Sequence, residues 1–240
     1  MAQTRESGKS PRARIIDIAA SLLHEHGPAA VTTRGVAEAA GVQAPAIYRL
    51  FGDKDGLLEA VAEHVMSTFV AEKSDTVDAA AADGIDPLDD LRVGWDKQIA
   101  FGLANPSVFR LLSDPDRVRD SVAARSGRQL LASRVHRVAV AGRLRVSERR
   151  AIDLIQAAGV GTIQQLLSTP TDHRDPGLAD AMYETLLQQI LTDAPGPSGD
   201  DIMTAAITLR AVTGELCGLS GAERRLMTEW LDRAIEAHQT

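Results

Sequence analysis

The sequence predicts an all-α protein with an N-terminal three-helix domain followed by a larger helical domain. Apolar residues make up 44% of the 240 residues and aromatic residues only 3%, so small and branched aliphatic side chains must fill the core. Alanine and leucine, which dominate this set, favour helices. Apolar residues recur at spacings of three and four, as at Leu178, Met182, Leu186 and Ile190, and no convincing run alternates with the period of two typical of strands.

Five helix starts are marked by a capping residue followed by proline. A side-chain acceptor followed by proline at the first helical position is typical of a helix N-terminus. Ser220 and Glu223 have the spacing of a capping box before a last helix. Together these signals predict roughly nine to eleven helices. The five pairs are Ser10–Pro11, Asp86–Pro87, Asn105–Pro106, Asp114–Pro115 and Asp175–Pro176.

Three turn-rich segments interrupt the helical pattern, at residues 74–87, 169–177 and 194–200. The first is small and acidic, and we expect it to divide the chain. The polar residues 1–10 are expected to form a disordered arm. The chain then divides into an N-terminal domain at 11–57, whose linking helix continues to about residue 73, and a helical domain at 74–240.

The charge distribution and the cysteine content limit the kinds of partner and cellular compartment to be expected. The net charge is −7, yet residues 1–54 hold seven Lys/Arg and five Asp/Glu, a balance of +2 that permits an approach to phosphate. The single cysteine, Cys217, excludes an intramolecular disulfide and a cysteine-based zinc site, which fits a reducing cytosol. We find no secretory signal and no apolar stretch near the ~20 residues that cross a bilayer. A cytoplasmic protein without membrane segments is therefore expected.

Residues 31–58 carry the pattern of a helix-turn-helix. A short helix capped by Thr32 or Thr33 is predicted to end near residue 40, and a second to run over 44–51. Counting from Thr33, the fifth position must be small, the ninth is the turn glycine and the fifteenth is branched and buried. Ala37, Gly41 and Ile47 occupy these positions. A plain helical hairpin is the alternative, but it explains neither the three matches nor the shortness of both helices.

The same stretch resembles the TetR family of transcriptional regulators over about 45 residues. The remainder matches the family only in being helical. The resemblance implies a homodimer, a three-helix DNA-binding domain at 11–57, and a domain at 74–240 that binds a small molecule and thereby releases DNA. The matching residues are the amphipathic run Arg14 to Leu23, Gly27, Val31, Thr32, Thr33, Val36, Ala37, Ala40, Gly41, Val42, Ile47, Tyr48, Phe51, Lys54, Leu57 and Leu58.

The resemblance implies that Tyr48 and Lys54 contact phosphates. Arg34 lies in the first turn of the preceding helix, from which a guanine edge and a phosphate are both within reach. Ala44 and Ala46 replace the longer polar side chains of many relatives, so thymine-methyl contacts and DNA shape are expected to carry more of the specificity. The predicted DNA-binding residues are Thr33, Arg34, Gln43, Ala44, Pro45, Ala46, Tyr48, Arg49 and Lys54.

An effector pocket and a dimer interface are expected in the second domain. Three of the scarce aromatic residues fall within fifteen positions, which suggests a mostly apolar pocket between helices of residues 88–168. The helices at 149–168 and 176–193 are expected to pair with their symmetry mates, and the pair at 200–238 to extend that interface or to shield the core. The predicted pocket residues are Trp95, Gln98, Phe101, Phe109, Gln129, His136 and Gln156. The predicted interface residues are Ala151, Ile152, Ile155, Ala158, Gly159, Gly161, Leu166, Leu186 and Ile190.

The sequence gives weaker support for functions other than a ligand-responsive DNA-binding regulator. No glutamate has a histidine three residues later, as a di-iron bundle requires, so no metal, cofactor or catalytic residue is expected. The eleven arginines of residues 110–150 suit either an anion site or pairing with the acidic segments on both sides. An architectural DNA-binding protein that senses nothing and a helical enzyme or carrier remain as alternatives to a ligand-responsive regulator.

Overall fold

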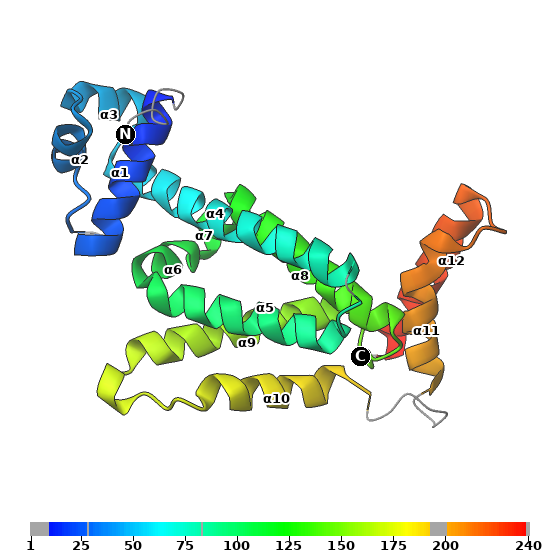
Figure 1. Cartoon of the computed structure of the whole chain (residues 1–240). Coiled ribbons are helices and arrows are strands. Elements are labelled where there is room, and N and C mark those ends of the chain that lie inside the picture. Colours follow the sequence, from blue (N-terminus) through cyan, green and yellow to red (C-terminus); the bar gives the residue numbers. More distant parts are fainter. Residues whose placement is uncertain (1–9, 28, 83, 193–200, 239–240) are drawn as a thin grey trace. The chain divides into compact units, whose positions relative to one another are not determined.

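The computed structural model describes residues 10–27, 29–82, 84–192 and 201–238. These residues form helices joined by turns, with no β-strand among them beyond one isolated bridge between Leu144 and Leu191, which confirms the predicted all-α class (Figure 1). The chain forms two compact units, which are described separately below. One comprises residues 1–73 and 104–127, and the other comprises residues 74–103 and 128–240.

The helices follow in chain order. They are α1 (Pro11–His26), α2 (Thr33–Ala40), α3 (Ala44–Phe51), α4 (Lys54–Ala82), α5 (Pro87–Ala104), α6 (Pro106–Leu112), α7 (Pro115–Asp120), α8 (Val122–Val140), α9 (Glu148–Ser168), α10 (Leu178–Ile190), α11 (Asp201–Val212) and α12 (Gly221–His238). Two short 3-10 turns, at Thr171–His173 and Thr213–Glu215, complete the described elements.

Most of the predicted helix starts are confirmed. Helices α1, α5, α6 and α7 each begin at the proline that follows a capping residue. The fifth prediction is wrong by two residues: the Asp175 carboxylate accepts a bond from the Gly177 N–H (2.8 Å), which forms a turn, and α10 begins only at Leu178. The capping box is present, since the Ser220 N–H donates to Glu223 (2.8 Å) and the Glu223 N–H donates to the Ser220 hydroxyl (3.3 Å). Hydrogen bonding with Ser220 lowers the pKa of Glu223 below its ordinary value.

The first unit is built around the small residues and aliphatic side chains of α1 to α4. An ion pair of 3.1 Å between His64 on α4 and Asp17 on α1 lies at the edge of this core. The buried apolar residues from α1 to α4 are Ile15, Ile16, Ala19, Leu23, Val31, Val36, Ala37, Ala40, Ile47, Leu57, Leu58, Val61, Ala62 and Val70.

The linking helix runs further than the sequence predicted. The acidic segment at 74–87 suggested an end near residue 73, but α4 continues to Ala82. The reason lies in its last four residues, 79–82, which are all alanine and have the highest helix propensity. A glycine, Gly84, follows two residues later.

Residues 104–127 belong to the first unit, whereas the expected domain at 74–240 included them. Hydrogen bonds of Glu63 on α4 help to explain why residues 104–127 belong to the first unit. Its carboxylate accepts a hydrogen bond of 2.6 Å from the Ser121 hydroxyl and another of 2.6 Å from the Ala123 N–H. Because Ala123 lies in the first turn of α8, Glu63 caps that helix from another element, satisfying an N–H that has no partner within its own helix.

The second unit contains a buried charge cluster. Asp90 on α5 pairs with the Arg134 Nε (3.1 Å) and with Arg137 Nη1 (3.0 Å), and both Asp90 and Arg134 are buried. A Cβ on Gly94 would lie 3.1–3.2 Å from the Arg134 guanidinium, so the glycine makes room for it. Arg128 likewise pairs with Asp153 (2.7 Å). These pairs favour the interpretation that the arginines of 110–150 neutralise acidic neighbours.

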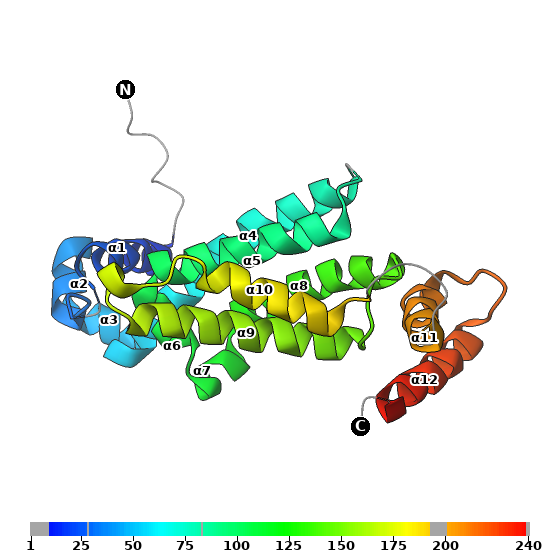
Figure 2. The same ribbon diagram turned by 90° about the horizontal axis from the view of Figure 1, so that it is seen from below.

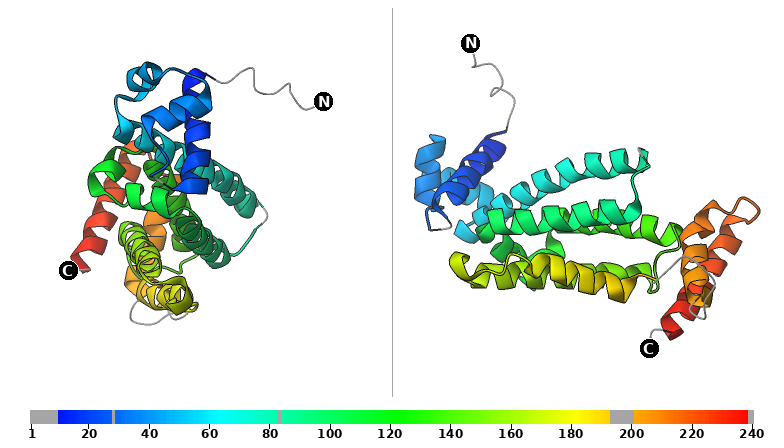
Figure 3. Two further views of the ribbon diagram at one scale, coloured as in Figure 1. Left: turned by 90° about the vertical axis from the view of Figure 1, so that its left-hand side faces the viewer. Right: turned by 60° about the horizontal axis from the view of Figure 1, so that its bottom comes forward.

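Helices α9 and α10 lie side by side along their length (Figure 2). Their inner faces bury aliphatic residues such as Ile155, Ile163, Leu186 and Ile190. Helices α11 and α12 pack against each other as a hairpin (Figure 3). None of the helices in the described ranges has both the length and the hydropathy of a membrane span.

Candidate nucleic-acid interface

Helices α2 and α3 are joined by a tight left-handed turn. The Thr32 hydroxyl accepts a hydrogen bond from the Gly35 N–H (3.0 Å) and so caps the start of α2. At the other end, Gly41 adopts φ 65° and ψ 34°, a conformation that costs glycine little and other residues more. The N–H groups of Gly41 and Val42 donate to Glu38 and Ala37 (3.1 and 2.9 Å), which satisfies the last carbonyls of α2.

Buried contacts hold α3 in place. Ile47, the predicted branched position, is fully buried, as are Val36 and Ala37 on α2. The Arg14 guanidinium of α1 donates to the Ala40 carbonyl (3.3 Å) and ties the first helix to the end of the second. The predicted helix-turn-helix core is therefore present, with Ile47 as its anchor on α3.

The joint between α3 and α4 is equally close. Asp53 caps α4 by accepting a hydrogen bond from the Gly56 N–H (2.8 Å). A Cβ on Gly56 would lie 2.1 Å from the Phe51 carbonyl oxygen, so any side chain here would displace the end of α3. The joint sets the position of Lys54, the first residue of α4, relative to Tyr48 on α3.

The predicted DNA-binding residues gather on the outer side of this arrangement. Tyr48 is 54% exposed although it follows the buried Ile47 directly. Its hydroxyl lies 3.4 Å from the Thr33 hydroxyl, which brings the start of α2 next to α3. Arg34, Gln43, Pro45, Arg49 and Lys54 are exposed, and Thr33, Ala44 and Ala46 are partly exposed. All nine therefore have side-chain surface open to solvent, and their role in binding DNA stays a prediction.

One further cation belongs to this surface and was missed in the sequence. Arg12, in the first turn of α1, is exposed, and its guanidinium lies 5.2 Å from the centroid of the Phe51 ring at the end of α3. Such a cation–π contact holds the charge beside the recognition helix. The sequence contains one weak signal for this role, which is the position of Arg12 in the first turn of an amphipathic helix. The contact itself could not be predicted, because Phe51 lies 39 positions later in the chain.

The residues predicted to line an effector pocket are divided between the two units. Phe109 belongs to the first unit, and the other six belong to the second. Gln129 is exposed, His136 pairs with Glu148 (3.3 Å), and Gln156 accepts a hydrogen bond from Arg128. Gln98 lies 2.9 Å from the position of a Cβ on Gly159, which shows how closely α5 and α9 approach. The effector pocket therefore stays a prediction. Of its predicted lining residues, Trp95, Gln98 and Phe101 all lie on α5.

Trp95 has a neighbour that the sequence did not suggest. Its ring centroid lies 5.5 Å from that of Tyr183 on α10, and both residues are buried. The Trp95 Nε1 and the Tyr183 hydroxyl have no hydrogen-bond partner. Burial raises the pKa of Tyr183, although Arg92, whose guanidinium lies 5.0 Å from the ring centroid, opposes the shift. Unpaired buried donors are costly, so this aromatic pair is a candidate position for an acceptor atom of a bound molecule inside the second unit.

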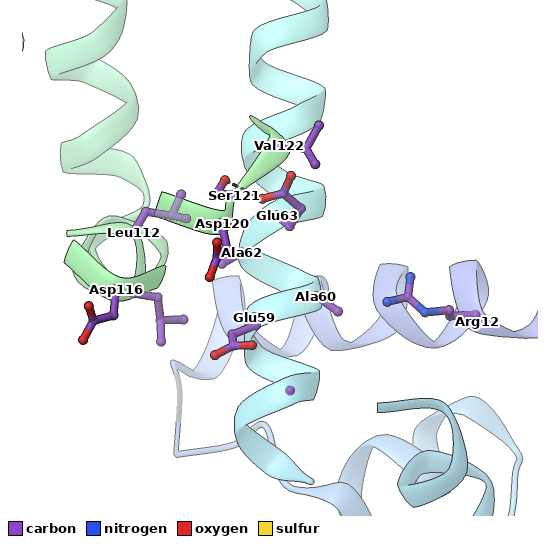
Figure 4. A pocket seen from close by; sticks show the side chains of 12 residues that line it. Arg12, Glu59, Ala60, Ala62, Glu63, Leu112, Asp116, Asp120, Ser121 and Val122 are labelled. Carbon is purple, nitrogen blue, oxygen red and sulfur yellow. Dashed lines mark hydrogen bonds between the residues drawn. The ribbon is translucent and has the colours of Figure 1, made fainter. Parts of the chain in front are cut away.

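A cavity of about 520 Å³ lies in the first unit, lined by residues of α1, α4, α6, α7 and the start of α8 (Figure 4). Its carboxylates come from Glu59 and Glu63 on α4 and from Asp116 and Asp120 on α7. Glu63 is occupied in capping α8, as Figure 4 shows for its bond with Ser121. This acidic lining is unsuited to phosphate, so the cavity is not part of the candidate nucleic-acid surface.

The side chains predicted to form a dimer interface are mostly core residues of the single chain. Ala151, Ile152, Ile155, Leu166 and Ile190 are all buried within the protomer. Helical periodicity revealed their apolar face but not which neighbour covers it. The outer faces instead expose Ala157, Val160 and Gly161 on α9, and Ala181, Met182 and Thr185 on α10. Across the described ranges, no group of three or more histidine, cysteine or carboxylate side chains could hold a metal.

Comparison with known families agrees with this geometry. Residues 15–61 match the model of the bacterial regulatory proteins of the tetR family. That range begins in α1, contains all of α2 and α3, and ends in α4, so it covers the whole helix-turn-helix described above. A curated relative, the HTH-type transcriptional regulator BetI of Paraburkholderia phytofirmans, is 38% identical over 72 residues. The match covers 30% of this chain and 37% of that relative's length.

Solved structures share the fold at low sequence identity. FadR of Bacillus halodurans, described as a fatty acid degradation regulator, has a TM-score of 0.56 at 18% identity, covering 79% of this chain and 99% of its own. A protein of Shewanella sp. PV-4 described as a tetR-family transcription regulator has a TM-score of 0.54 at 19% identity, covering 77% and 100%. These likenesses concern the fold alone. The family match itself is confined to residues 15–61, which resemble the N-terminal domain of the tetR family of bacterial regulatory proteins.

Proposed function

We propose that this protein is a sequence-specific DNA-binding transcriptional regulator, and that it acts as a repressor released from its operator by a small molecule. The observation that carries the DNA-binding part is the contrast on α3, where Ile47 is fully buried and the adjacent Tyr48 is 54% exposed beside Arg49. A short helix anchored on one side and polar on the other suits insertion into a major groove.

The roles proposed for single residues follow from their positions. Tyr48 and Lys54, at the two sides of the α3–α4 joint, are proposed to contact phosphates. Lys54 lies at the N-terminus of α4, where a cation is unfavourable for the helix dipole, so an external anion is its better partner. Arg34 and Gln43 reach towards the groove from the ends of their helices. The small Ala44 and Ala46 leave room for thymine methyl groups.

A dimer is proposed through the outer faces of α9 and α10. The exposed positions there are small, with Ala157, Gly161 and Ala181 among them, and small residues let helices approach closely. A two-fold dimer would place two copies of α3 on one side of a palindromic operator, with half-sites about one helical turn, or a multiple of it, apart. The expected cytoplasmic location follows from this role and stays a prediction.

The effector is proposed to bind within the second unit beside Trp95 and Tyr183. Both side chains present an unpaired donor, so a mostly apolar molecule with one or two acceptor atoms is the best match. Such a molecule lowers operator occupancy only if it binds the DNA-incompetent form more tightly than the competent one.

The DNA-binding proposal is tested by selecting bound sequences from a random duplex pool and titrating the selected operator at several salt concentrations. Lys54→Ala should weaken binding to all sequences about equally and lower the slope of log K against log salt by roughly one. Lys97→Ala on α5, which removes the same charge elsewhere, is the matched control and should leave both unchanged. If Lys54→Ala binds the operator normally, Lys54 does not contact a phosphate. Equal binding to unrelated sequences would favour an architectural protein.

The effector proposal is tested with Trp230→Phe, which leaves Trp95 as the only tryptophan of the two. A compound that releases the operator should change the Trp95 emission over the same concentration range. Tyr183→Phe should then alter the affinity for that compound while DNA binding in its absence is retained. If release is unaffected by changes at both Trp95 and Tyr183, the effector binds at another site.

A further inference from the structure

The second unit holds buried polar atoms that can donate hydrogen bonds and have no acceptor. Within the described ranges, the buried side-chain atoms without a partner are Trp95 Nε1, Arg134 Nη2, Arg143 Nε, Tyr183 Oη and Thr192 Oγ1. All five belong to the second unit, and each of them can donate. The three nitrogen atoms can only donate. Because an unpaired buried donor is costly, an acceptor from outside the chain would stabilise this unit.

Arg134 on α8 differs from the other four residues because it is both charged and almost fully buried, at 3% exposed. Its Nε donates to Asp90 on α5 (3.1 Å), and Asp90 also accepts from Arg137 Nη1 (3.0 Å). Arg137 donates in addition to the Ile85 carbonyl (2.6 Å). In this cluster of Asp90, Arg134 and Arg137, one carboxylate faces two guanidinium groups. The cluster therefore carries one excess positive charge, and Arg134 Nη2 is its unpaired donor.

The packing around Arg134 is apolar and tight. Val138, four residues later on the same face of α8, is fully buried, and so are Val135 and Leu91, which adjoin Arg134 and Asp90 in the chain. A Cβ on Gly94 would lie 3.1–3.2 Å from the guanidinium, so the backbone of α5 lies against it. A water molecule can accept from Nη2 but leaves the excess charge in place. An anion supplies both the acceptor and the opposite charge.

We propose that Arg134 binds a carboxylate, and that the small molecule sensed by the second unit is a monocarboxylic acid with an apolar body. A single negative charge balances the cluster, whereas a phosphate group with two charges would exceed it. The apolar body is expected because Trp95 follows Gly94 directly, so an aromatic ring adjoins the contact with Arg134. The sensing role rests on the proposed function. The anion site itself does not.

Binding requires a rearrangement, because Arg134 Nη2 is enclosed by the chain. The acid must bind a form in which α5 and α8 lie further apart, and Gly94 is where the two helices meet at the guanidinium. Arg137, whose side chain is 20% exposed, connects the cluster to solvent. The enclosed form keeps an unbalanced charge, whereas the acid-bound form does not. The acid therefore shifts the population towards the more open form.

The anion site is tested with hexanoate, octanoate, benzoate and phenylacetate, each beside its primary amide, which has a similar shape but no charge. At least one acid should raise the thermal midpoint of the full-length chain. In the Trp230→Phe chain the same acid should change the Trp95 emission at concentrations at least about tenfold lower than its amide, since hydrogen bonds between charged groups are the stronger ones. The proposal is overturned if acids and amides behave alike, or if none of the acids binds at up to about 10 mM.

Arg134→Gln should weaken binding of that acid by about ten- to a hundredfold and leave the affinity for its amide unchanged. The variant is expected to fold, because Asp90 keeps Arg137 as a partner in a balanced pair. Arg134→Lys keeps the charge and should retain part of the affinity. Arg128→Gln, which removes an exposed cation of α8 that pairs with Asp153 (2.7 Å), is the matched control. Equal affinities of Arg134→Gln and Arg128→Gln for the acid would overturn the anion site.

Circular dichroism without ligand checks that Arg134→Gln is folded. If it is not, the comparison of acid and amide on the unaltered chain decides. Operator binding then separates the anion site from the proposed function. An acid that binds through Arg134 and leaves operator affinity unchanged would contradict the sensing role and retain the site. An amide that releases the operator as well as its acid does would contradict the anion site and retain the proposed function.

Discussion

Glu63 and Ser121 are joined by a hydrogen bond of 2.6 Å between a carboxylate on α4 and a hydroxyl just before α8. The same carboxylate accepts from the Ala123 N–H, and the Ser121 hydroxyl accepts from the Ala124 N–H (2.9 Å). Ser121 is buried, so water cannot readily replace these bonds. One residue of α4 therefore completes the N-terminus of a helix 60 positions later in the chain.

We expect Glu63→Ala to lower the free energy of unfolding by about 1.5–3 kcal/mol, the range for hydrogen bonds to a charged group. Glu63→Gln keeps an acceptor oxygen and should lose less. Glu38→Ala removes an exposed carboxylate from α2 and should stay within about 0.5 kcal/mol of the parent, as surface changes do. Urea titration followed by circular dichroism measures all three. Equal stability of Glu63→Ala and Glu38→Ala would show that the cap is unimportant.

Gly56→Ala tests the joint between α3 and α4. Its Cβ would lie 2.1 Å from the Phe51 carbonyl, so the end of α3 must shift, at a cost of about 1–3 kcal/mol in unfolding free energy. Operator affinity should fall with it, because Tyr48 and Lys54 lie on the two sides of the joint. Gly218→Ala in the turn before α12, where no atom lies within 4 Å of the added carbon, is the matched control. It should change the free energy of unfolding by no more than about 0.5 kcal/mol, and a loss at both positions would contradict the argument.

Tyr48→Phe separates the hydroxyl from the ring. Because Tyr48 is 54% exposed and its contact with Thr33 is long at 3.4 Å, we expect the thermal midpoint to be unchanged. Loss of one phosphate hydrogen bond should reduce operator affinity by about 0.5–1.5 kcal/mol, which is roughly two- to tenfold. Fluorescence anisotropy with labelled operator measures the change. Unaltered affinity would mean that the tyrosine serves packing alone.

The burial of Tyr183 leads us to expect that the free energy of unfolding falls at high pH. Burial raises its pKa in the folded protein above the ordinary value of about 10 that it has when unfolded. Its contribution is therefore fully present below pH 10 and decreases as the pH rises above that value, because only the unfolded chain then releases the proton. In the Tyr48→Phe background, phenolate absorbance should appear only together with unfolding.

Tyr183→Phe is the counterpart of that experiment. It removes a buried hydroxyl that has no partner, so the free energy of unfolding at neutral pH should rise by about 1 kcal/mol. The alkaline decline should also become shallower than in the parent. If Tyr183 ionises while the protein is still folded, the ring is accessible to water and the proposed effector site is open at that side.

The sequence alone determined the helical class and the whole helix-turn-helix, because those features depend on neighbours a few residues apart. The Thr32 cap, the Gly41 turn and the buried Ile47 all lie within sixteen positions, and their spacing specifies the local backbone. It also predicted four of the five proline-marked helix starts, for the same reason. The run of four alanines at the end of α4 carried a helix signal as well, but the acidic residues before it outweighed that signal in the prediction.

Only the tertiary structure decided which faces are covered. Periodicity identified the apolar faces of α9 and α10, but could not tell that Ile155 and Leu186, which were expected at a dimer interface, are buried within the single chain. It likewise could not bring Tyr183 to Trp95 or Arg12 to Phe51, because such pairs depend on how helices distant in sequence cross. Burial is a property of the packed chain, and a single sequence shows that a side chain is apolar without showing what lies against it.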